Sequence, residues 1–258
     1  MSNNNSSKNS DLSIAILGYG KMGSAIAQAL VSKNFNVSII DKTSHSNYQE
    51  FDVCFIATKP QQFDSIDEFP KSKIYISIMA GVSLDNFTEA IKSKLDVPTK
   101  AKFIRAMPNI AALVAKSVTV YSSKVLNRSE EIIVKKVLAS FGVVEQIEEH
   151  KIDAFTALAG SGPAYFALLA QHLQTKAKEL GFLEAQAKLF VEETIVGLGE
   201  LLKTGLSVEK LIEMIASKGG TTEAGLESFS NNKFEDTVSE VVESALSRAV
   251  ELNSNYDN

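Results

Sequence analysis

The segment from Ser217 to Leu226 carries residue types suited to binding an anion. It reads Ser-Lys-Gly-Gly-Thr-Thr-Glu-Ala-Gly-Leu, so two glycines precede two hydroxyl side chains at an expected helix start. A helix N-terminus presents unpaired backbone N–H groups and a partial positive charge, which favour a nearby carboxylate or phosphate. An ordinary capped helix has the same signature. The segment alone therefore indicates either a cap or an anion site.

A second glycine-rich segment runs from Gly18 to Gly23. It reads Gly-Tyr-Gly-Lys-Met-Gly, follows the apolar run 13–17 and opens a helical stretch over 22–31. A strand, a glycine turn and a helix in this order place a pyrophosphate on backbone N–H groups. Gly18 permits the tight turn, Gly20 lets phosphates approach, and Gly23 lets helix and strand pack closely. The segment predicts a dinucleotide site; a glycine-rich turn without a nucleotide is the alternative.

Asp41 stands at the end of the second expected strand, where an acid commonly accepts hydrogen bonds from the ribose hydroxyls of a dinucleotide. A 2′-phosphate there would face a carboxylate at close range, which favours NAD over NADP. Lys42, Thr43 and Ser44 follow directly and could soften that repulsion. The sequence therefore leaves the preference between NADH and NADPH open.

Further loops follow expected strands at 57–61, 77–81 and 105–109. Loops at the carboxyl ends of strands line the ligand crevice of an open α/β sheet. We therefore expect Lys59 at the edge of the cofactor, with a solvated lysine as the alternative. The Gly-Ser-Gly-Pro-Ala-Tyr step at 160–165 interrupts a helical region, which indicates either close backbone packing or a ligand.

Composition narrows the class of protein. The chain has 258 residues, 45% of them apolar, which is enough for two domains. We find no apolar run near the roughly 18–20 residues of a membrane span and no signal peptide, so we expect a cytoplasmic protein without a membrane partner. The net charge of −5 argues against nucleic acid as a partner and favours small molecules.

The potential metal ligands and nucleophiles are few. Cys54 is the only cysteine, and its apolar surroundings in the sequence predict a buried strand residue rather than a catalytic one. His45, His150 and His172 show no metal-ligand spacing with cysteines or carboxylates, so we expect no metal site.

Two patterns divide the chain. Over 11–150, β-branched runs alternate with helical stretches, which predicts a mainly parallel, doubly wound α/β sheet with helices on both faces. Over 151–258 the pattern is helical throughout, and the broad apolar faces of its last helices indicate a dimer interface, with a buried core as the alternative. The expected strands are 14–17, 36–40, 53–57, 74–78, 102–105, 118–121 and 143–147.

The two ends of the chain have a different composition. Segments 1–10 and 253–258 are rich in Asn and Ser, so we expect both to be disordered tails without a function.

Taken together, these segments resemble the pyrroline-5-carboxylate reductases of proline biosynthesis. The resemblance spans nearly the whole chain in order. Its last two segments are specific to the family, whereas the glycine loop is shared by many dehydrogenases. The matching segments are Gly18–Gly23, Lys59–Gln61, Ala80–Gly81, Met107–Asn109, Thr156–Tyr165 and Gly219–Thr222.

The resemblance implies a Rossmann domain followed by a helical domain that interlocks in a homodimer, often assembled further into a ring of dimers. It implies reduction of 1-pyrroline-5-carboxylate to L-proline with NADPH or NADH. Such a site must hold a carboxylate, contact the ring nitrogen and expose one face of the ring to the nicotinamide, and it needs no metal. Backbone N–H groups around Gly220 and Thr221 would take the carboxylate, and the Thr222 hydroxyl would contact the ring nitrogen.

The same resemblance assigns the remaining site residues. Glu149 matches a family carboxylate near the substrate, with Glu148 as the alternative register. The expected catalytic residue is Thr222, and the expected substrate-binding residues are Glu149, Ser217, Gly219, Gly220, Thr221 and Thr222. The expected cofactor-binding residues are Gly18, Tyr19, Gly20, Lys21, Met22, Gly23, Asp41, Ala57, Thr58, Lys59, Pro60, Met79, Ala80 and Gly81.

The chain departs from the family pattern at three places. Lys218 replaces the proline that usually precedes the glycines, Ile110-Ala111 replaces a Thr-Pro pair, and the segment after Asp41 is short. Because Asp41 replaces a more often neutral or basic neighbourhood, we hypothesise a weaker preference for NADPH.

Two alternatives to a reductase remain. A 3-hydroxyacid dehydrogenase would need a lysine where Phe166 stands. A non-catalytic dinucleotide sensor would keep the fold without turnover, and the retention of Thr222 and of the Gly219-Gly220 turn argues against it.

Overall fold

The computed structural model describes residues 9, 11–40, 50–63, 65–66, 68–94 and 100–254. They form two compact units: one contains the chain up to Pro163 and from Ser244 onward, and the other contains Ala164–Glu243. The sequence places a domain boundary near residue 150, whereas the first compact unit extends to Pro163. The physical reason is packing, because Ile152 is buried with Met107 and Val120 of the sheet.

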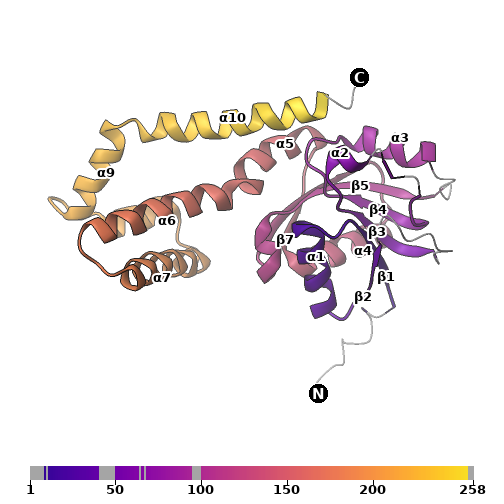
Figure 1. The fold of residues 1–258 in the computed structure, drawn as a ribbon, viewed down its shortest axis with the longest axis horizontal. Helices are drawn as coiled ribbons and strands as arrows, with labels where there is room; N and C mark the ends of the chain where they lie inside the picture. Colours follow the sequence, from indigo (N-terminus) through magenta and orange to yellow (C-terminus); the bar gives the residue numbers. More distant parts are fainter. Residues whose placement is uncertain are drawn as a thin grey trace, which may run out of the picture. The chain divides into compact units, whose positions relative to one another are not determined.

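The first unit is built on a seven-stranded sheet with strand order β2-β1-β3-β4-β5-β6-β7 (Figure 1). Neighbouring strands pair in parallel except β5 and β6, which are antiparallel. The predicted doubly wound, mainly parallel sheet is therefore confirmed. The strands are β1 (Ser13–Leu17), β2 (Asn36–Ile40), β3 (Phe51–Ile56), β4 (Ser72–Ser77), β5 (Lys102–Met107), β6 (Ser117–Ser123) and β7 (Gly142–Gln146).

Alternation along the strands gives the sheet a core on each face. Ile14 and Ile16 belong to one apolar cluster, and Ala15 and Leu17 belong to the other. Helices α1 and α4 contribute to the first cluster, and α2 and α3 contribute to the second, as a doubly wound sheet requires. The helical elements of this unit are α1 (Lys21–Ser32), α2 (Pro60–Phe63), α3 (Leu84–Lys94), η1 (Ile110–Val114), α4 (Arg128–Leu138), η2 (Ala139–Phe141), η3 (Glu149–Lys151), α5 (Ile152–Phe155) and η4 (Thr156–Gly160).

The rest of the described chain is helical. From residue 151 to residue 254 it contains no strand, which confirms the all-helical prediction for this half. The helices are α6 (Gly162–Glu179), α7 (Glu184–Lys203), α8 (Val208–Ile215), α9 (Thr221–Asn231) and α10 (Phe234–Ser254). The end of α10 returns to the first unit.

The C-terminal tail prediction is wrong for its first two residues. Asn253 and Ser254 belong to α10, and the Asn253 amide donates a hydrogen bond to Asp153. A tertiary partner thus orders a segment whose composition alone predicts disorder. Residues 255–258, 1–8 and 10 lie outside the described part of the chain, whereas Asn9 donates a 2.8 Å hydrogen bond to the Lys33 carbonyl.

One helical stretch has the length and composition of a membrane span, which by itself is weak evidence for one. The 31-residue helical stretch Glu149–Glu179 contains a window with a mean hydropathy of 1.2, so by length and composition it is apolar enough to cross a membrane. Only 17% of that window is buried within the chain. The sequence shows no continuous apolar run here, because the Gly-Ser-Gly-Pro step at 160–163 interrupts the apolar residues.

A carboxylate links the starts of β1 and β3. Asp52 Oδ2 accepts hydrogen bonds from Ser13 N at 2.9 Å and Ser13 Oγ at 3.0 Å, and Lys73 Nζ lies 2.8 Å from Oδ1. Partial burial raises the pKa of the Asp52 carboxyl, but the hydrogen bonds from Lys73 and Ser13 outweigh burial and hold that pKa below its usual range.

This lowered pKa predicts how the stability of the fold depends on pH. The ionised carboxylate stabilises the folded state above the unfolded-state pKa, and that contribution is lost as the pH falls through the folded-state pKa. We expect Asp52→Asn to reduce the free energy of unfolding by about 1 kcal/mol at pH 7. The loss should become smaller only as the pH falls below the ordinary aspartate pKa of about 3.9 and through the still lower folded-state pKa, where the wild-type carboxyl becomes protonated as well.

Urea unfolding at both pH values measures the two losses. Asp11→Asn, at an exposed aspartate of the same unit, is the control. Equal losses for Asp52→Asn at neutral and acid pH would contradict the assignment.

Candidate functional site

Three stretches of backbone approach one another at the carboxyl end of β1. Gly18 has a φ of +100°, and a Cβ there would lie 2.7 Å from both the Ala57 carbonyl carbon and the Thr58 nitrogen. A Cβ on Gly23 would overlap the Gly18 carbonyl oxygen. Only glycine fits at either position, because the contacts are closer than a side chain allows. At Gly20, by contrast, nothing lies within 4 Å of where a Cβ would be.

A cavity of about 400 Å³ opens beside this turn. It lies at the carboxyl ends of β1, β2 and β3, where the winding of the sheet changes direction, since β2 and β3 lie on opposite sides of β1. Helix α1 begins after Gly20, and no side chain caps its first N–H groups. The arrangement suits a phosphate-bearing ligand. The lining residues are Gly18, Tyr19, Gly20, Ile39, Ile40, Ala57, Thr58, Lys59 and Gln62.

Most of the expected cofactor residues lie in or next to this cavity. Lys21, Met22 and Gly23 form the first turn of α1, and Pro60 begins α2. Asp41 lies outside the described residues. Ile39, Ile40 and Gln62 also line the cavity and were not predicted from the sequence. The position of Ile39 and Ile40 at the end of β2 could have identified these two as lining residues.

The turn after β4 holds the last three expected cofactor residues. It is linked to the loop after β3, because the Thr58 hydroxyl lies 3.7 Å from Met79 Sδ. Gly81 has a φ of +70°, and a Cβ there would overlap Leu252 of α10. The end of the chain therefore packs directly on the Met79–Gly81 turn.

Glu149 occupies a structural position in the first unit. Its Oε1 accepts hydrogen bonds from Leu84 N and from Arg105 Nη1, each at 2.9 Å. The Leu84 N–H opens helix α3, so Glu149 acts as a cap supplied by another segment. The structure thus assigns Glu149 a tertiary role, and its contact with a substrate stays a prediction.

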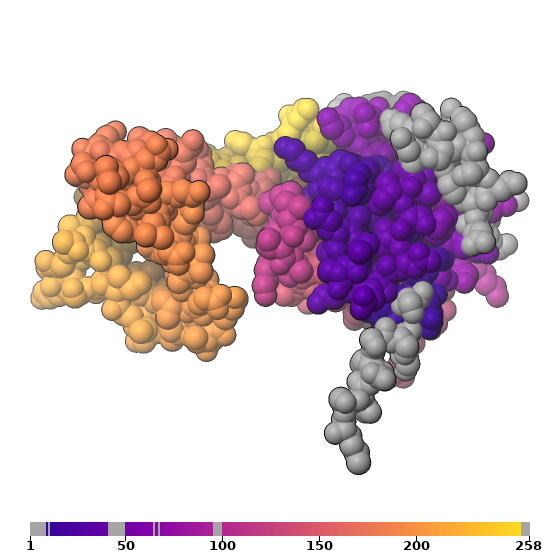
Figure 2. All heavy atoms as spheres, turned by 60° about the horizontal axis from the view of Figure 1, so that its bottom comes forward, coloured from indigo at the N-terminus to yellow at the C-terminus, as the bar shows by residue number. Residues whose placement is uncertain are grey.

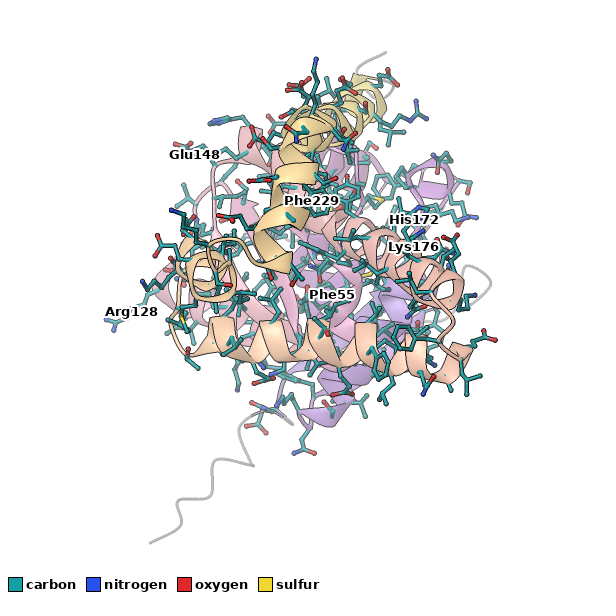
Figure 3. All side chains as sticks on the ribbon, turned by 90° about the vertical axis from the view of Figure 1, so that its left-hand side faces the viewer. Phe55, Arg128, Glu148, His172, Lys176 and Phe229 are labelled. Carbon is teal, nitrogen blue, oxygen red and sulfur yellow. The ribbon has the colours of Figure 1, made fainter. Side chains whose placement is uncertain are left out.

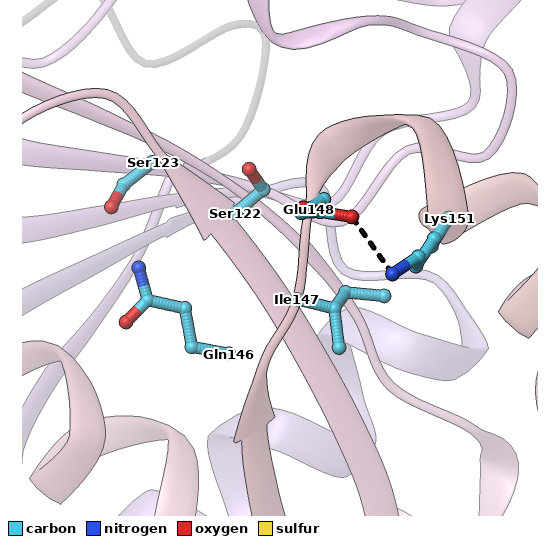
Figure 4. A pocket seen from close by; sticks show the side chains of 6 residues that line it. All are labelled: Ser122, Ser123, Gln146, Ile147, Glu148 and Lys151. Atoms are coloured by element: carbon cyan, nitrogen blue, oxygen red, sulfur yellow. Dashed lines mark ion pairs between the residues drawn. The ribbon is translucent and has the colours of Figure 1, made fainter.

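Glu148, the alternative register, points elsewhere. It lines an open cavity of about 470 Å³ at the ends of β6 and β7, where Lys151 Nζ lies 2.8 Å from its carboxylate (Figure 4). The hydrogen bond from Lys151 lowers the pKa of Glu148. The cavity is lined by Ser122, Ser123, Gln146, Ile147, Glu148 and Lys151.

The predicted substrate turn lies in the second unit. Gly219 has a φ of +72° and its N–H donates to Glu223 Oε2 at 2.5 Å, while Gly220 N donates to the Ser217 carbonyl at 2.9 Å. A Cβ on Gly220 would lie only 2.6 Å from Ser217 Oγ. Gly220 is the N-cap of α9 and provides no side chain to cap it.

These contacts decide which N–H groups remain for an anion. The Gly219 and Gly220 groups are already bonded, whereas helix geometry leaves those of Thr221 and Thr222 without an intrahelical acceptor. Glu149 belongs to the first unit and this turn belongs to the second.

The residues before the Gly-Pro pair at 162–163 form a turn of π-helix. Ser161 N donates to the Thr156 carbonyl at 2.9 Å, which closes the single π-helical turn η4. Asn109 Nδ2 donates to the Ala159 carbonyl at 3.1 Å. A Cβ at Gly160 would make only an ordinary contact with Thr156 at 3.5 Å, and nothing lies within 4 Å of one at Gly162. Close packing therefore does not require these two glycines, and a ligand at this step stays a prediction.

The remaining candidate groups show no catalytic arrangement. Cys54 is fully buried in β3, as predicted, and burial raises the pKa of its thiol to about 12. Within the described residues, no cluster of three or more His, Cys, Asp or Glu side chains could hold a metal ion. His45 lies outside those residues.

The second unit lacks a core of its own. Among residues 164–243, only Ala187 and Leu211 are buried, and Figure 2 shows open space among the orange spheres of this unit. Phe229, labelled in Figure 3, remains 42% exposed although its ring centroid lies 4.5 Å from that of Phe234. So much apolar surface exposed to water is typical of an interface.

Comparison with known proteins accounts for both units. Residues 149–252 match the family model for pyrroline-5-carboxylate reductase dimerisation, and residues 13–118 match the NAD binding domain of 6-phosphogluconate dehydrogenase. The dimerisation match covers the exposed helices and also the apolar stretch that begins at Glu149.

Similar proteins cover most of the chain. Pyrroline-5-carboxylate reductase 2 of Bacillus subtilis is 33% identical over 80% of this chain and 74% of its own length. The enzyme of Thermus thermophilus is 31% identical over 93% of this chain and 98% of its own. The crystal structure of the Plasmodium falciparum pyrroline carboxylate reductase with NADP bound aligns with a TM-score of 0.79 at 28% identity, covering 95% of this chain and 99% of that one. With this identity over most of both chains and a matching dimerisation domain, the chain belongs to the pyrroline-5-carboxylate reductase family.

Proposed function

We propose that this protein reduces 1-pyrroline-5-carboxylate to L-proline in the last step of proline biosynthesis, with NADH or NADPH as the reductant. The observation that carries the proposal is that one chain combines the nucleotide cavity at Gly18–Gly20 with the family's Gly219–Thr222 turn. The family relationship excludes the 3-hydroxyacid dehydrogenase, and a turnover assay separates the reductase from a non-catalytic sensor.

The residues around the cavity fit a dinucleotide. The open space at Gly20 admits phosphates, and the first N–H groups of α1 bind them. Lys59 is exposed at the cavity wall and adds a positive charge there. When bound, the reduced nicotinamide supplies the hydride that the imine carbon accepts.

The turn before α9 fits the substrate. The N–H groups of Thr221 and Thr222 bind the substrate carboxylate, assisted by the partial positive charge of the helix start. The half-buried Thr222 hydroxyl hydrogen-bonds the ring nitrogen, which gains a proton as the C=N bond is reduced. The bond from Gly219 N to Glu223 keeps the turn in its positive-φ conformation.

The active form in this proposal is a homodimer in the cytoplasm, and the family resemblance adds a ring of such dimers as a higher assembly. A second copy would bury the apolar faces of the second unit, which this chain by itself leaves exposed. Those faces would then not be available to a membrane.

The first prediction concerns phosphate approach at Gly20. Gly20→Ala should fold normally, because nothing surrounds the added methyl group, but the methyl group occupies the phosphate path. We expect the Kd for NADH or NADPH to rise about tenfold, or ~1.4 kcal/mol. Gly23→Ala, where the methyl group overlaps Gly18, should instead destabilise the fold by about 1–3 kcal/mol.

Nucleotide titration and thermal unfolding of both variants separate the two effects. Binding by Gly20→Ala within about twofold of wild type would remove this glycine from the proposed phosphate site.

A second prediction concerns the proton at the ring nitrogen. Thr222→Ala should lower kcat/KM for 1-pyrroline-5-carboxylate on the order of 10²-fold, because it removes a positioned hydroxyl, and should leave nucleotide binding intact. Thr222→Ser keeps the hydroxyl and is the matched control. Steady-state kinetics of Thr222→Ala within about threefold of wild type would exclude Thr222 from the mechanism.

A third prediction concerns the choice of cofactor. A carboxylate at Asp41 beside the adenosine ribose repels a 2′-phosphate, so we expect a higher kcat/KM with NADH than with NADPH. Asp41→Asn should shift the ratio toward NADPH. The assays need matched ionic strength, because salt screens such repulsion. Equal or better efficiency of the wild type with NADPH would refute the role given to Asp41.

A further inference from the structure

An ionic cluster that the proposed chemistry does not use lies at the end of β5, with a buried arginine and partly buried carboxylates. It comprises Arg105, Glu149, Asp153 and Asn253, and we call it the Arg105 cluster. The Arg105 side chain is only 2% exposed; Nη1 lies 2.9 Å from Glu149 Oε1 and Nη2 lies 2.5 Å from Asp153 Oδ1. Asp153 in turn accepts the hydrogen bond from the Asn253 amide.

The cluster joins four segments that are distant in the sequence. Arg105 belongs to β5, Glu149 and Asp153 belong to η3 and α5, and Asn253 belongs to the last turn of α10. Through Glu149 the cluster also reaches Leu84 N, the start of the helix that follows the Met79–Gly81 turn.

Leu252, the neighbour of Asn253, contacts the Met79–Gly81 turn directly. Leu252 lies so close to Gly81 that the glycine has no room for a Cβ. The Met79–Gly81 turn is therefore held by Leu252 at Gly81, and the helix that follows it is capped by Glu149. Both contacts depend on the Arg105 cluster, since Asn253 anchors the end of α10 and Arg105 orients the Glu149 carboxylate.

The cluster is an expensive way to stabilise a fold. Four buried side-chain N and O atoms lack a partner in the described residues, and three of them are Arg105 Nε, Glu149 Oε2 and Asn253 Oδ1. A buried polar atom without a partner lowers stability, and ion pairs that include a buried charge often stabilise less than apolar residues of the same size. A gain in stability therefore does not account for the cluster by itself. A role in holding β5, η3, α5 and the end of α10 in fixed relative positions does account for it.

We propose that Arg105 and Asn253 are positioning residues for the cofactor: through Glu149 and through the end of α10 they hold the Met79–Gly81 turn in the geometry that receives the nucleotide. The inference rests on the proposed function only in taking this turn as part of the cofactor site. A displacement of about 1 Å at a position that holds a ligand is costly, and at this turn the cost falls on nucleotide binding.

The test changes Asn253, because Arg105→Met would leave two partly buried carboxylates without their cation and is the variant at risk of not folding. Asn253→Ala removes the amide, and Asn253→Asp places a second carboxylate against Asp153. Asn231→Ala, at an exposed asparagine at the end of α9, is the matched control. The readouts are Tm, the Kd for NADH by direct titration, and KM and kcat separately.

We expect the Kd and KM for NADH to rise about tenfold in Asn253→Ala and further in Asn253→Asp. The expected changes in the KM for 1-pyrroline-5-carboxylate and in kcat are less than about threefold, and Asn231→Ala should match wild type. A lower Tm with an unchanged NADH Kd in both Asn253 variants would show a purely structural cluster and overturn the proposal.

Direct titration separates this inference from the proposed function. A wild-type protein that binds NADH but does not turn over 1-pyrroline-5-carboxylate would refute the reductase activity, while the Kd ratios would still decide the positioning role. A folded wild-type dimer that binds neither NADH nor NADPH would overturn both proposals.

Discussion

The close approach of three backbones around Gly18 is the constraint on which the first unit depends. Strand β1, the start of α1 and the loop after β3 meet there with no space for a side chain at Gly18 or Gly23. This approach lets α1 lie against the sheet and aims its first N–H groups at the end of β1. Gly20, between these two glycines, stays open, since nothing lies within 4 Å of where its Cβ would be.

The second unit depends on a different constraint, which is the lack of a core within one chain. Helices α7 to α9 expose apolar side chains that a single copy does not bury, and only Ala187 and Leu211 are buried between residues 164 and 243. Such a unit gains little stability from its own packing. The unit matches a dimerisation domain, and in a dimer a second copy would cover these apolar faces. Helix α9, which the Gly219–Thr222 turn precedes, is part of this unit.

The Arg105 cluster lies in the first unit, where the chain leaves for the helices of the second unit and where it returns from them. The chain passes from the sheet to the helices at α5 and α6, and it returns through α10. Both passages meet at Asp153, which lies at the start of the outgoing helix and accepts the amide of Asn253 at the end of the returning one. The buried charge of Arg105 makes this junction specific, because a displaced carboxylate would leave Arg105 unpaired away from water.

The sequence by itself determined the elements and their class. Short β-branched apolar runs located all seven strands to within two residues, because a sheet that is covered on both faces needs apolar side chains on both sides of its strands. Glycine spacing located the nucleotide loop, because φ and close approach restrict Gly18 and Gly23 to one residue type. These are local consequences of backbone sterics and burial, so a single chain segment carries enough information to predict them.

Only the tertiary structure decided where long-range polar partners lie. Glu148 and Glu149 are adjacent and identical in type, yet one faces an open cavity and the other contacts Arg105 and Leu84. Asn253 belongs to a segment with the composition of a disordered tail, yet its amide donates a hydrogen bond to the carboxylate of Asp153, 100 residues earlier in the sequence. The physical reason is that a charge or an amide gains most of its energy from whichever partner folding brings within hydrogen-bond reach, and no periodicity in the sequence records that partner.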